Sequence, residues 1–191
     1  MAKIVVMGAG IGGISQVYEL RKELGKDHEI FLVGDSDRFE FTPSNPWVAV
    51  GWRKEKQITV DLPDLMKKFN IGFSGAGVRR LHPDDNRLEL NDDSSIEYDY
   101  LVIATGPKLA FEEVEGLGPD GHTQSVCKTG HAETAHIDFK KLIKDPGPVV
   151  VGAAPMASCF GPAYEYLFIL DTELKKRKIR DKIKMHFVTP E

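Results

Sequence analysis

The sequence predicts an α/β fold in which a parallel sheet is built from βαβ units, and two observations support this prediction. Residues 3–7 (KIVVM) form a continuous apolar run, typical of a strand buried on both faces, and a glycine-rich turn and an amphipathic stretch follow directly. The same order of apolar run, turn and amphipathic stretch begins again at Pro148. We therefore expect one βαβ-based domain and the start of a second.

The first βαβ unit is defined by a helical pattern between two strands. Apolar residues recur largely at helical spacing over 14–24, and Gly25 supplies a helix stop. Residues 29–33 (EIFLV) then predict a second buried strand. A right-handed crossover makes the two strands parallel neighbours.

Shorter elements are expected between and after the two units. Residues 39–52, rich in aromatics and prolines, indicate an ordered loop. Further expected elements are helices at 59–70 and 130–144, and strands around 71–80, 87–90, 96–104 and 182–189.

Three glycines in the first turn, Gly8, Gly10 and Gly13, make the pattern Gly-x-Gly-x-x-Gly between a strand and a helix. In that setting the first glycine permits the tight turn, the second lets the backbone approach a pyrophosphate, and the third lets the helix pack close to the strand. The helix start adds free N–H groups and a positive dipole end. The pattern predicts dinucleotide binding in a Rossmann-like fold; incidental glycines in a turn are the alternative.

Two further positions fit such a site. An acidic residue at the end of the second strand usually binds a ribose hydroxyl. Asp35 lies one place beyond the expected strand-end position, Gly34, so it is either that residue or a loop cap. Ala104, Thr105 and Gly106 follow the apolar strand at 96–104, where a small-residue backbone can close on a cofactor.

Composition and charge exclude several classes of protein. The chain has 191 residues, 41% of them hydrophobic, and a formal net charge of −4 with interspersed signs, so we expect no nucleic-acid partner. The basic residues between 175 and 180 indicate a solvated helix end. No apolar run approaches the roughly 20 residues of a membrane span, and no signal peptide is evident, so a cytoplasmic location is expected.

The two cysteines, Cys127 and Cys159, are too few for a disulfide scaffold. Cys127 and His131 are four residues apart, as in half of a zinc site, but Cys159 has no nearby histidine or cysteine, so no metal site is expected. On residue type alone each cysteine is most simply a small buried hydrophobe.

The glycine motif, followed at 98–106 by YDYLVIATG, resembles the FAD-binding pattern of the pyridine nucleotide-disulfide oxidoreductase superfamily, in which a second dinucleotide fold interrupts the FAD fold. The segments at 41–52, 103–112 and 152–166 look like those of sulfide:quinone oxidoreductases, and the match spans the whole chain. The resemblance implies a flavoprotein that binds FAD, oxidises sulfide at a cysteine pair beside the flavin, and delivers two electrons to membrane quinone.

The same resemblance implies site residues. Cys127 and Cys159 fall where the first two of three redox cysteines are expected, and the third would lie in a carboxy-terminal half that this sequence lacks. His131 is a candidate to hold a proton or the thiolate near Cys127, and Glu165 is a candidate base; a surface histidine and a helix-face glutamate are the alternatives. We also count Asn45 and Val78 among the cofactor-binding candidates.

The second turn, from Gly152 to Ala157, has alanine at the second and third glycine positions and a proline between them. Methyl groups there crowd a pyrophosphate, which disfavours NAD(P)H. Sulfide is therefore the favoured electron donor. The alternatives are a nicotinamide-dependent quinone or disulfide reductase of the same superfamily, discriminated by flavin bleaching with NADH, and a flavin-binding module without catalysis.

The expected domains are a FAD-binding domain over 1–110, a connecting segment over 111–147, and the start of a second dinucleotide-type domain over 148–191. We expect a truncated chain, catalytically crippled alone, whose exposed apolar surface favours self-association into a homo-oligomer. In the full-length protein the missing half would supply the quinone pocket and attachment to the inner face of the cell membrane.

Overall fold

The computed structural model describes residues 1–157 and 160–190 of the chain. It contains two compact units. Unit 1 comprises 1–41 and 59–109, and unit 2 comprises 42–58 and 110–191.

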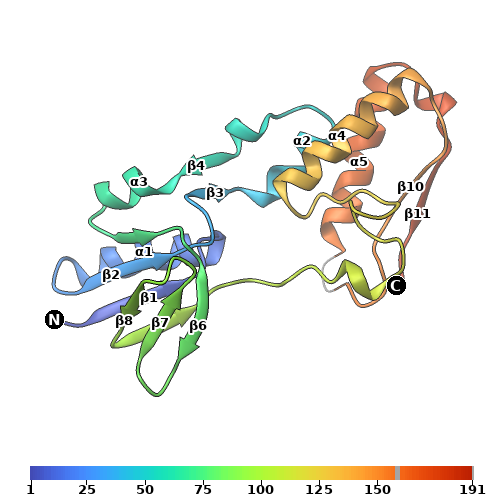
Figure 1. Ribbon diagram of the computed structural model, residues 1–191. Helices are drawn as coiled ribbons and strands as arrows, with labels where there is room; N and C mark the ends of the chain where they lie inside the picture. The colour runs from blue at the N-terminus through green and yellow to red at the C-terminus, as the bar shows by residue number, and fades with distance from the viewer. Residues whose placement is uncertain (158–159, 191) are drawn as a thin grey trace. The chain divides into compact units, whose positions relative to one another are not determined.

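A four-stranded parallel sheet forms the centre of unit 1 (Figure 1). Its order is β5-β2-β1-β9. The strands are β1 (Lys3–Met7), β2 (Glu29–Val33), β5 (Gly72–Ser74) and β9 (Tyr100–Ile103), and all three pairings are parallel. β1 and β2 have the bounds that the apolar runs predict. Because every pairing is parallel, the carboxyl ends of all four strands lie at one edge.

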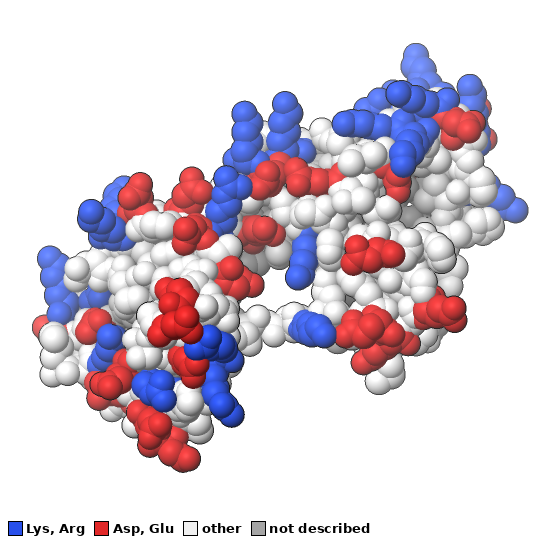
Figure 2. All heavy atoms as spheres, in the orientation of Figure 1, with Lys and Arg blue, Asp and Glu red and all other residues white. Residues whose placement is uncertain are grey.

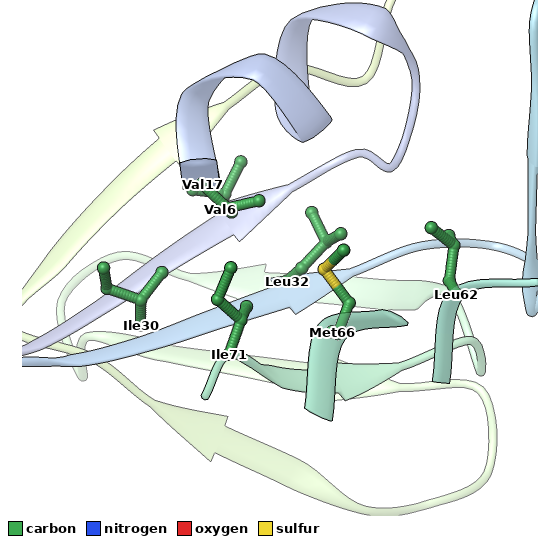
Figure 3. Close-up of a cluster of buried hydrophobic side chains, with 7 residues drawn as sticks. All are labelled: Val6, Val17, Ile30, Leu32, Leu62, Met66 and Ile71. Atoms are coloured by element: carbon green, nitrogen blue, oxygen red, sulfur yellow. The ribbon is translucent and has the colours of Figure 1, made fainter. Parts of the chain in front are cut away.

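Helices α1 (Ile11–Leu24) and α3 (Leu62–Lys68) contribute to the core on this sheet. Figure 3 shows side chains from β1, β2, α1, α3 and the residue before β5 in one buried cluster: Val6, Val17, Ile30, Leu32, Leu62, Met66 and Ile71. α1 begins three residues before the expected start, because Gly12 and Gly13 belong to its first turn and carry no apolar side chain that periodicity could detect.

Two small antiparallel sheets complete unit 1. One pairs β3 (Arg38–Glu40) with β4 (Thr59–Asp61), so the stretch 59–70, expected as helix throughout, begins as a strand. The other has the order β6-β7-β8, with β6 (Val78–His82), β7 (Arg87–Leu90) and β8 (Ser95–Glu97).

Two expected strands each divide between sheets. The stretch 71–80 becomes β5 and β6, because the chain turns at Gly77, whose φ is +75°. The stretch 96–104 becomes β8 and β9. The break lies at Asp99, whose side-chain Oδ2 accepts a hydrogen bond from the backbone N–H of Lys3 at 2.6 Å.

Over its described residues, unit 2 packs three α-helices with one parallel strand pair. The helices are α2 (Asn45–Ala49), α4 (Thr129–Lys144) and α5 (Gly161–Lys176), and the pair is β10 (Val149–Gly152) with β11 (Met185–Val188). The 3₁₀ turns are Thr42–Ser44, Glu55–Gln57, Phe111–Glu113 and Arg180–Lys182. The stretch 39–52, expected as a loop, therefore contains a helix whose Val48 and Ala49 are buried against α4.

The units differ from the expected domain bounds in two respects: residues 42–58 leave the first stretch and pack in unit 2, and the expected connecting segment 111–147 also belongs to unit 2. The functional domain assignment itself stays a prediction. Within the described residues, no helix is long and apolar enough to cross a membrane.

Candidate functional site

The glycine-rich turn of unit 1 lies at the carboxyl edge of the parallel sheet. Residues 8–10 connect β1 to α1. The N–H of Gly8 donates to the Val33 carbonyl at 2.8 Å, and the N–H of Ala104 donates to the Met7 carbonyl at 2.7 Å. The turn is therefore held between the ends of β2 and β9, where ligands bind in parallel α/β sheets.

Two of the three glycines are required by close packing. Gly8 has a φ of +114°, and a Cβ there would overlap the Ala104 carbonyl oxygen. A Cβ at Gly13 would overlap the Gly8 carbonyl oxygen. Neither position can hold a side chain unless the backbone shifts.

Gly10 differs, because a Cβ there would meet nothing within 4 Å. Gly10 is the N-cap of α1, its φ of −77° is accessible to any residue, and no side chain caps the helix. The first turn of α1 also contains no acidic residue. An open backbone at a helix start, with no carboxylate to compete, fits the pyrophosphate of a dinucleotide.

Asp35 and Val78 lie near each other at the same edge. Asp35 is exposed and follows β2 after one residue, Gly34. The N–H of Gly77 donates to the Gly34 carbonyl at 2.7 Å, which brings the start of β6 alongside Asp35. A ribose or base bound beside Asp35 would therefore have the Val78 backbone within its surroundings.

Ala104, Thr105 and Gly106 follow β9 at this edge. Thr105 and Gly106 are exposed, and Gly106 has a φ of +68° with nothing within 4 Å of a Cβ built on it. The strand end therefore leaves open backbone next to the glycine turn. Unit 1 thus brings together eight of the predicted cofactor-binding residues: Gly8, Gly10, Gly13, Asp35, Val78, Ala104, Thr105 and Gly106.

The ninth, Asn45, lies in unit 2 as the first residue of α2 and is completely buried. Its Oδ1 accepts a hydrogen bond from Thr129 Oγ1 at 3.2 Å. Its Nδ2 is buried and has no hydrogen-bond partner among the described residues. Because the protein encloses this side chain completely, the cofactor role of Asn45 stays a prediction.

The turn of the second βαβ pattern is unlike the first. β10 ends at Gly152 and α5 begins at Gly161, so residues 153–160 intervene where only residues 8–10 do in unit 1. Met156 in this turn has a φ of +66° and is 93% exposed. The connection of eight residues is thus longer than the three-residue glycine turn of unit 1, and a pyrophosphate site needs a tight turn.

Cys127 and His131 flank the start of α4. The Cys127 side chain is exposed, and its backbone N–H donates to Ser125 Oγ at 3.1 Å. His131 is in the first turn of α4, with its ring centroid 5.6 Å from that of Phe111. Burial, and then the charge of Lys128, lower the pKa of His131, so its imidazole is neutral at neutral pH. Its buried Nδ1 has no hydrogen-bond partner in the described chain.

Of the other two predicted catalytic residues, the structure describes Glu165. This residue is exposed in α5. Cys159 lies outside the described residues. Among residues 1–157 and 160–190, no group of three or more histidine, cysteine, aspartate and glutamate side chains could hold a metal ion.

Thr129 is a residue that the sequence reasoning missed. It is the first residue of α4, 1% exposed, and hydrogen-bonded to Asn45 across 84 positions of sequence. A threonine at a helix start suggests a capping role. Its burial against α2 depends on a tertiary contact that no local pattern contains.

Neither of two other surface features overlaps the predicted cofactor edge. A shallow cavity of about 510 Å³ lies at the opposite, amino-terminal edge of the unit 1 sheet, beside Met1, Glu29 and Gly72. Figure 2 shows Lys and Arg gathered over the ends of α4 and α5. Part of that charge is paired: Asp171 accepts from Lys175 and Arg180 at 2.7 and 2.6 Å, which holds the pKa of its carboxyl below the usual range.

Comparison with known proteins gives likeness over the whole chain. It is 47% identical over 192 aligned residues to a sulfide-quinone reductase of Aquifex aeolicus, covering 100% of this chain and 44% of that protein. It is 30% identical to a mitochondrial sulfide:quinone oxidoreductase of Dictyostelium discoideum, covering 98% of this chain and 42% of that protein. The chain spans less than half the length of these relatives.

A solved structure matches the fold over the whole length of this chain. The X-ray structure of sulfide:quinone oxidoreductase from Aquifex aeolicus matches with a TM-score of 0.94 and 46% identity, over 100% of this chain and 44% of that one. The sequence profile of pyridine nucleotide-disulphide oxidoreductases matches residues 2–165. The chain therefore belongs to the pyridine nucleotide-disulphide oxidoreductase family, and it has the Rossmann-like FAD-binding fold of that family.

Proposed function

We propose that the protein oxidises sulfide to sulfur or polysulfide with FAD and passes the electrons to a quinone. The observation that carries this proposal is the 47% identity to the Aquifex sulfide-quinone reductase over the entire chain. A likeness that covers both units, rather than the FAD-binding unit alone, favours a shared substrate as well as a shared cofactor.

The difference between the two βαβ turns supports sulfide over a nicotinamide as electron donor. Unit 1 has a tight turn with an open Gly10 at the helix start, whereas residues 153–160 form a long connection with alanine and proline. One complete cradle and one degenerate turn suit an enzyme that binds a single dinucleotide.

In this proposal, unit 1 holds the ADP part of FAD. Gly8, Gly10 and Gly13 with the start of α1 hold the pyrophosphate, and Asp35 accepts a hydrogen bond from a ribose hydroxyl. The remaining contacts come from Val78, Ala104, Thr105 and Gly106. When bound, FAD supplies a two-electron acceptor.

Cys127 and Cys159 are the redox thiols of this proposal. Hydrosulfide attacks one sulfur of a disulfide in which a redox cysteine takes part, so that this cysteine becomes a persulfide and its partner sulfur leaves as a thiolate. His131 and Glu165 would transfer the protons of this step. Because burial lowers the pKa of His131, its neutral imidazole can accept a proton from the incoming sulfide at neutral pH.

The quinone and the membrane are assigned to the full-length protein. Quinones that carry respiratory electrons are lipid-soluble, so we propose that the full-length protein works peripherally at the inner face of the cell membrane. Assembly into a homo-oligomer belongs to the same proposal.

Anaerobic stopped-flow absorbance of the FAD-loaded, full-length protein tests the proposal. We expect sulfide to bleach the flavin rapidly in the wild type and at least about a hundredfold more slowly in Cys159→Ala and Cys127→Ala, since a lone thiol cannot cycle. FAD content, measured from the flavin absorbance, controls for loss of cofactor. Bleaching by NADH but not by sulfide would replace this proposal with the nicotinamide-dependent reductase.

A further inference from the structure

A buried hydrogen bond connects α2 to the segment that carries Cys127. Thr129 Oγ1 donates to Asn45 Oδ1 at 3.2 Å, and the two residues are 1% and 0% exposed. Thr129 comes two residues after Cys127 and is the first residue of α4. The bond therefore fixes α4 to α2 at the end nearest the thiol.

A second contact fixes the same segment on the other side of Cys127. Val126 packs against a buried cluster formed by α2, α4 and the end of the 42–58 stretch, whose members are Val48, Ala49, Ile58, Ala132 and Ala135. Cys127 itself is exposed. The thiol is thus presented to solvent from a short stretch that is anchored immediately before it by packing and shortly after it by a hydrogen bond.

The packing of Val126 and the hydrogen bond of Thr129 restrain the segment in different ways. Apolar packing resists separation of α2 and α4 but is not directional, so it does not define how the start of α4 is rotated. A buried hydrogen bond is directional, and breaking it leaves unsatisfied polar groups in a dry environment. Asn45 Nδ2 already lacks a partner in the part of the chain described, so loss of the Thr129 hydroxyl would leave the whole amide unpaired.

We propose that Asn45 and Thr129 are positioning residues that hold Cys127 in place for reaction with sulfide. This inference rests on the proposed function, because it assigns the hydrogen bond a role only if Cys127 is a redox thiol. Misplacement of a reacting group by about 1 Å can lower a rate by about a hundredfold, so a single buried bond at this place has a measurable effect on turnover.

The test is a set of α4 variants of the full-length, FAD-loaded protein. Thr129→Val removes the hydroxyl while conserving shape, and Thr129→Ser restores the hydroxyl. Thr134→Val is the matched control, because Thr134 Oγ1 donates to the Gly130 carbonyl at 3.1 Å on an exposed part of the same helix. Amide hydrogen exchange at residues 126–130 reports the anchoring, and steady-state kinetics with sulfide and a quinone report the chemistry.

We expect Thr129→Val to speed amide exchange at 126–130 and to lower kcat with sulfide by about tenfold to a hundredfold, while KM for quinone and FAD content stay unchanged. Thr129→Ser should recover most of the wild-type rate, and Thr134→Val should match the wild type. If Thr129→Val does not fold, Thr129→Ala carries the same comparison, since it removes the hydroxyl without adding bulk.

Cys127→Ala, measured alongside, distinguishes failure of the redox role of Cys127 from failure of the positioning role of Thr129. If Cys127→Ala oxidises sulfide normally, the proposed role of Cys127 is wrong. If Cys127→Ala is inactive but Thr129→Val turns over as fast as Thr134→Val, only the positioning role is overturned. Faster exchange in Thr129→Val without a lower kcat would likewise reduce the hydrogen bond to a structural contact.

Discussion

Replacing Gly10 and Gly13 separately with alanine tests whether the glycine-rich turn serves the cofactor and the fold through different residues. A Cβ at Gly13, in the first turn of α1, would overlap the Gly8 carbonyl oxygen, which lies in a turn held between β2 and β9. The backbone must shift, so overpacking should cost about 3 kcal/mol. For a chain of this size that lowers Tm by about 6–12 °C.

Gly10→Ala should instead leave the stability intact and weaken the binding of FAD. The φ of −77° suits alanine, and nothing lies within 4 Å of the added methyl group, so the apoprotein should be as stable as the wild type or up to about 1 kcal/mol more stable. The methyl group would instead occupy the space where a pyrophosphate approaches the backbone, and we expect FAD affinity to fall at least about tenfold.

Thermal unfolding of the apoprotein and fluorescence titration with FAD measure the two effects independently. If Gly10→Ala binds FAD like the wild type, the open backbone at Gly10 is not the phosphate site. If Gly13→Ala leaves Tm unchanged, close packing at Gly13 is not what requires a glycine there.

Three further predictions concern unit 2. Glu173 is 7% exposed and accepts hydrogen bonds from Trp52 Nε1 at 2.6 Å and from Arg177 Nε at 2.7 Å. Glu173→Ala should therefore lower the free energy of unfolding, measured by urea titration, by about 2–3 kcal/mol, and Glu173→Gln should lower it by less. Equal losses in the two variants would contradict this prediction. The pKa of His131 is lower in the folded than in the unfolded protein, so the unfolded chain takes up a proton first as the pH falls, and the free energy of unfolding should decrease below about pH 6.5. His131→Gln should weaken this pH dependence. Plots of the free energy of unfolding against pH that run parallel for the variant and the wild type would refute the prediction. Lys178 follows α5 and has a φ of +59°, a conformation that glycine adopts without the strain of a side chain. Lys178→Gly should therefore stabilise the protein by about 1 kcal/mol, seen in scanning calorimetry as a Tm higher by a few degrees. An unchanged or lower Tm would mean that the lysine side chain makes a compensating contact.

The local order of strand, turn and helix was predictable because it is encoded in adjacent residues. The bounds of β1 and β2 follow from uninterrupted apolar runs, and the placement of Gly8, Gly10 and Gly13 follows from their spacing. Family likeness then extended the prediction from a dinucleotide fold to FAD.

Elements defined by contacts between distant parts of the chain were not predictable in this way. α2 contains Pro46 and Trp47 in a stretch that reads as a loop, and its helical form depends on burial against α4. β9 joins β1 across most of unit 1, and the break before β9 depends on the bond between Asp99 and Lys3. The Asn45–Thr129 contact is of the same kind, since neither residue type indicates the other.

Residues 42–58 pack in unit 2 although unit 1 residues flank them in the sequence, and this arrangement affects how the protein folds. Val48, Ala49 and Ile58 belong to a buried cluster that is completed by residues of α4, which the ribosome makes much later. Those apolar side chains must remain uncovered while the rest of unit 1 is synthesised. Folding of unit 2 therefore closes a long loop, which is slow and entropically costly. An excised piece beginning at residue 110 would lack part of its own core, so neither unit corresponds to a single stretch of chain that could be cut out and expected to fold.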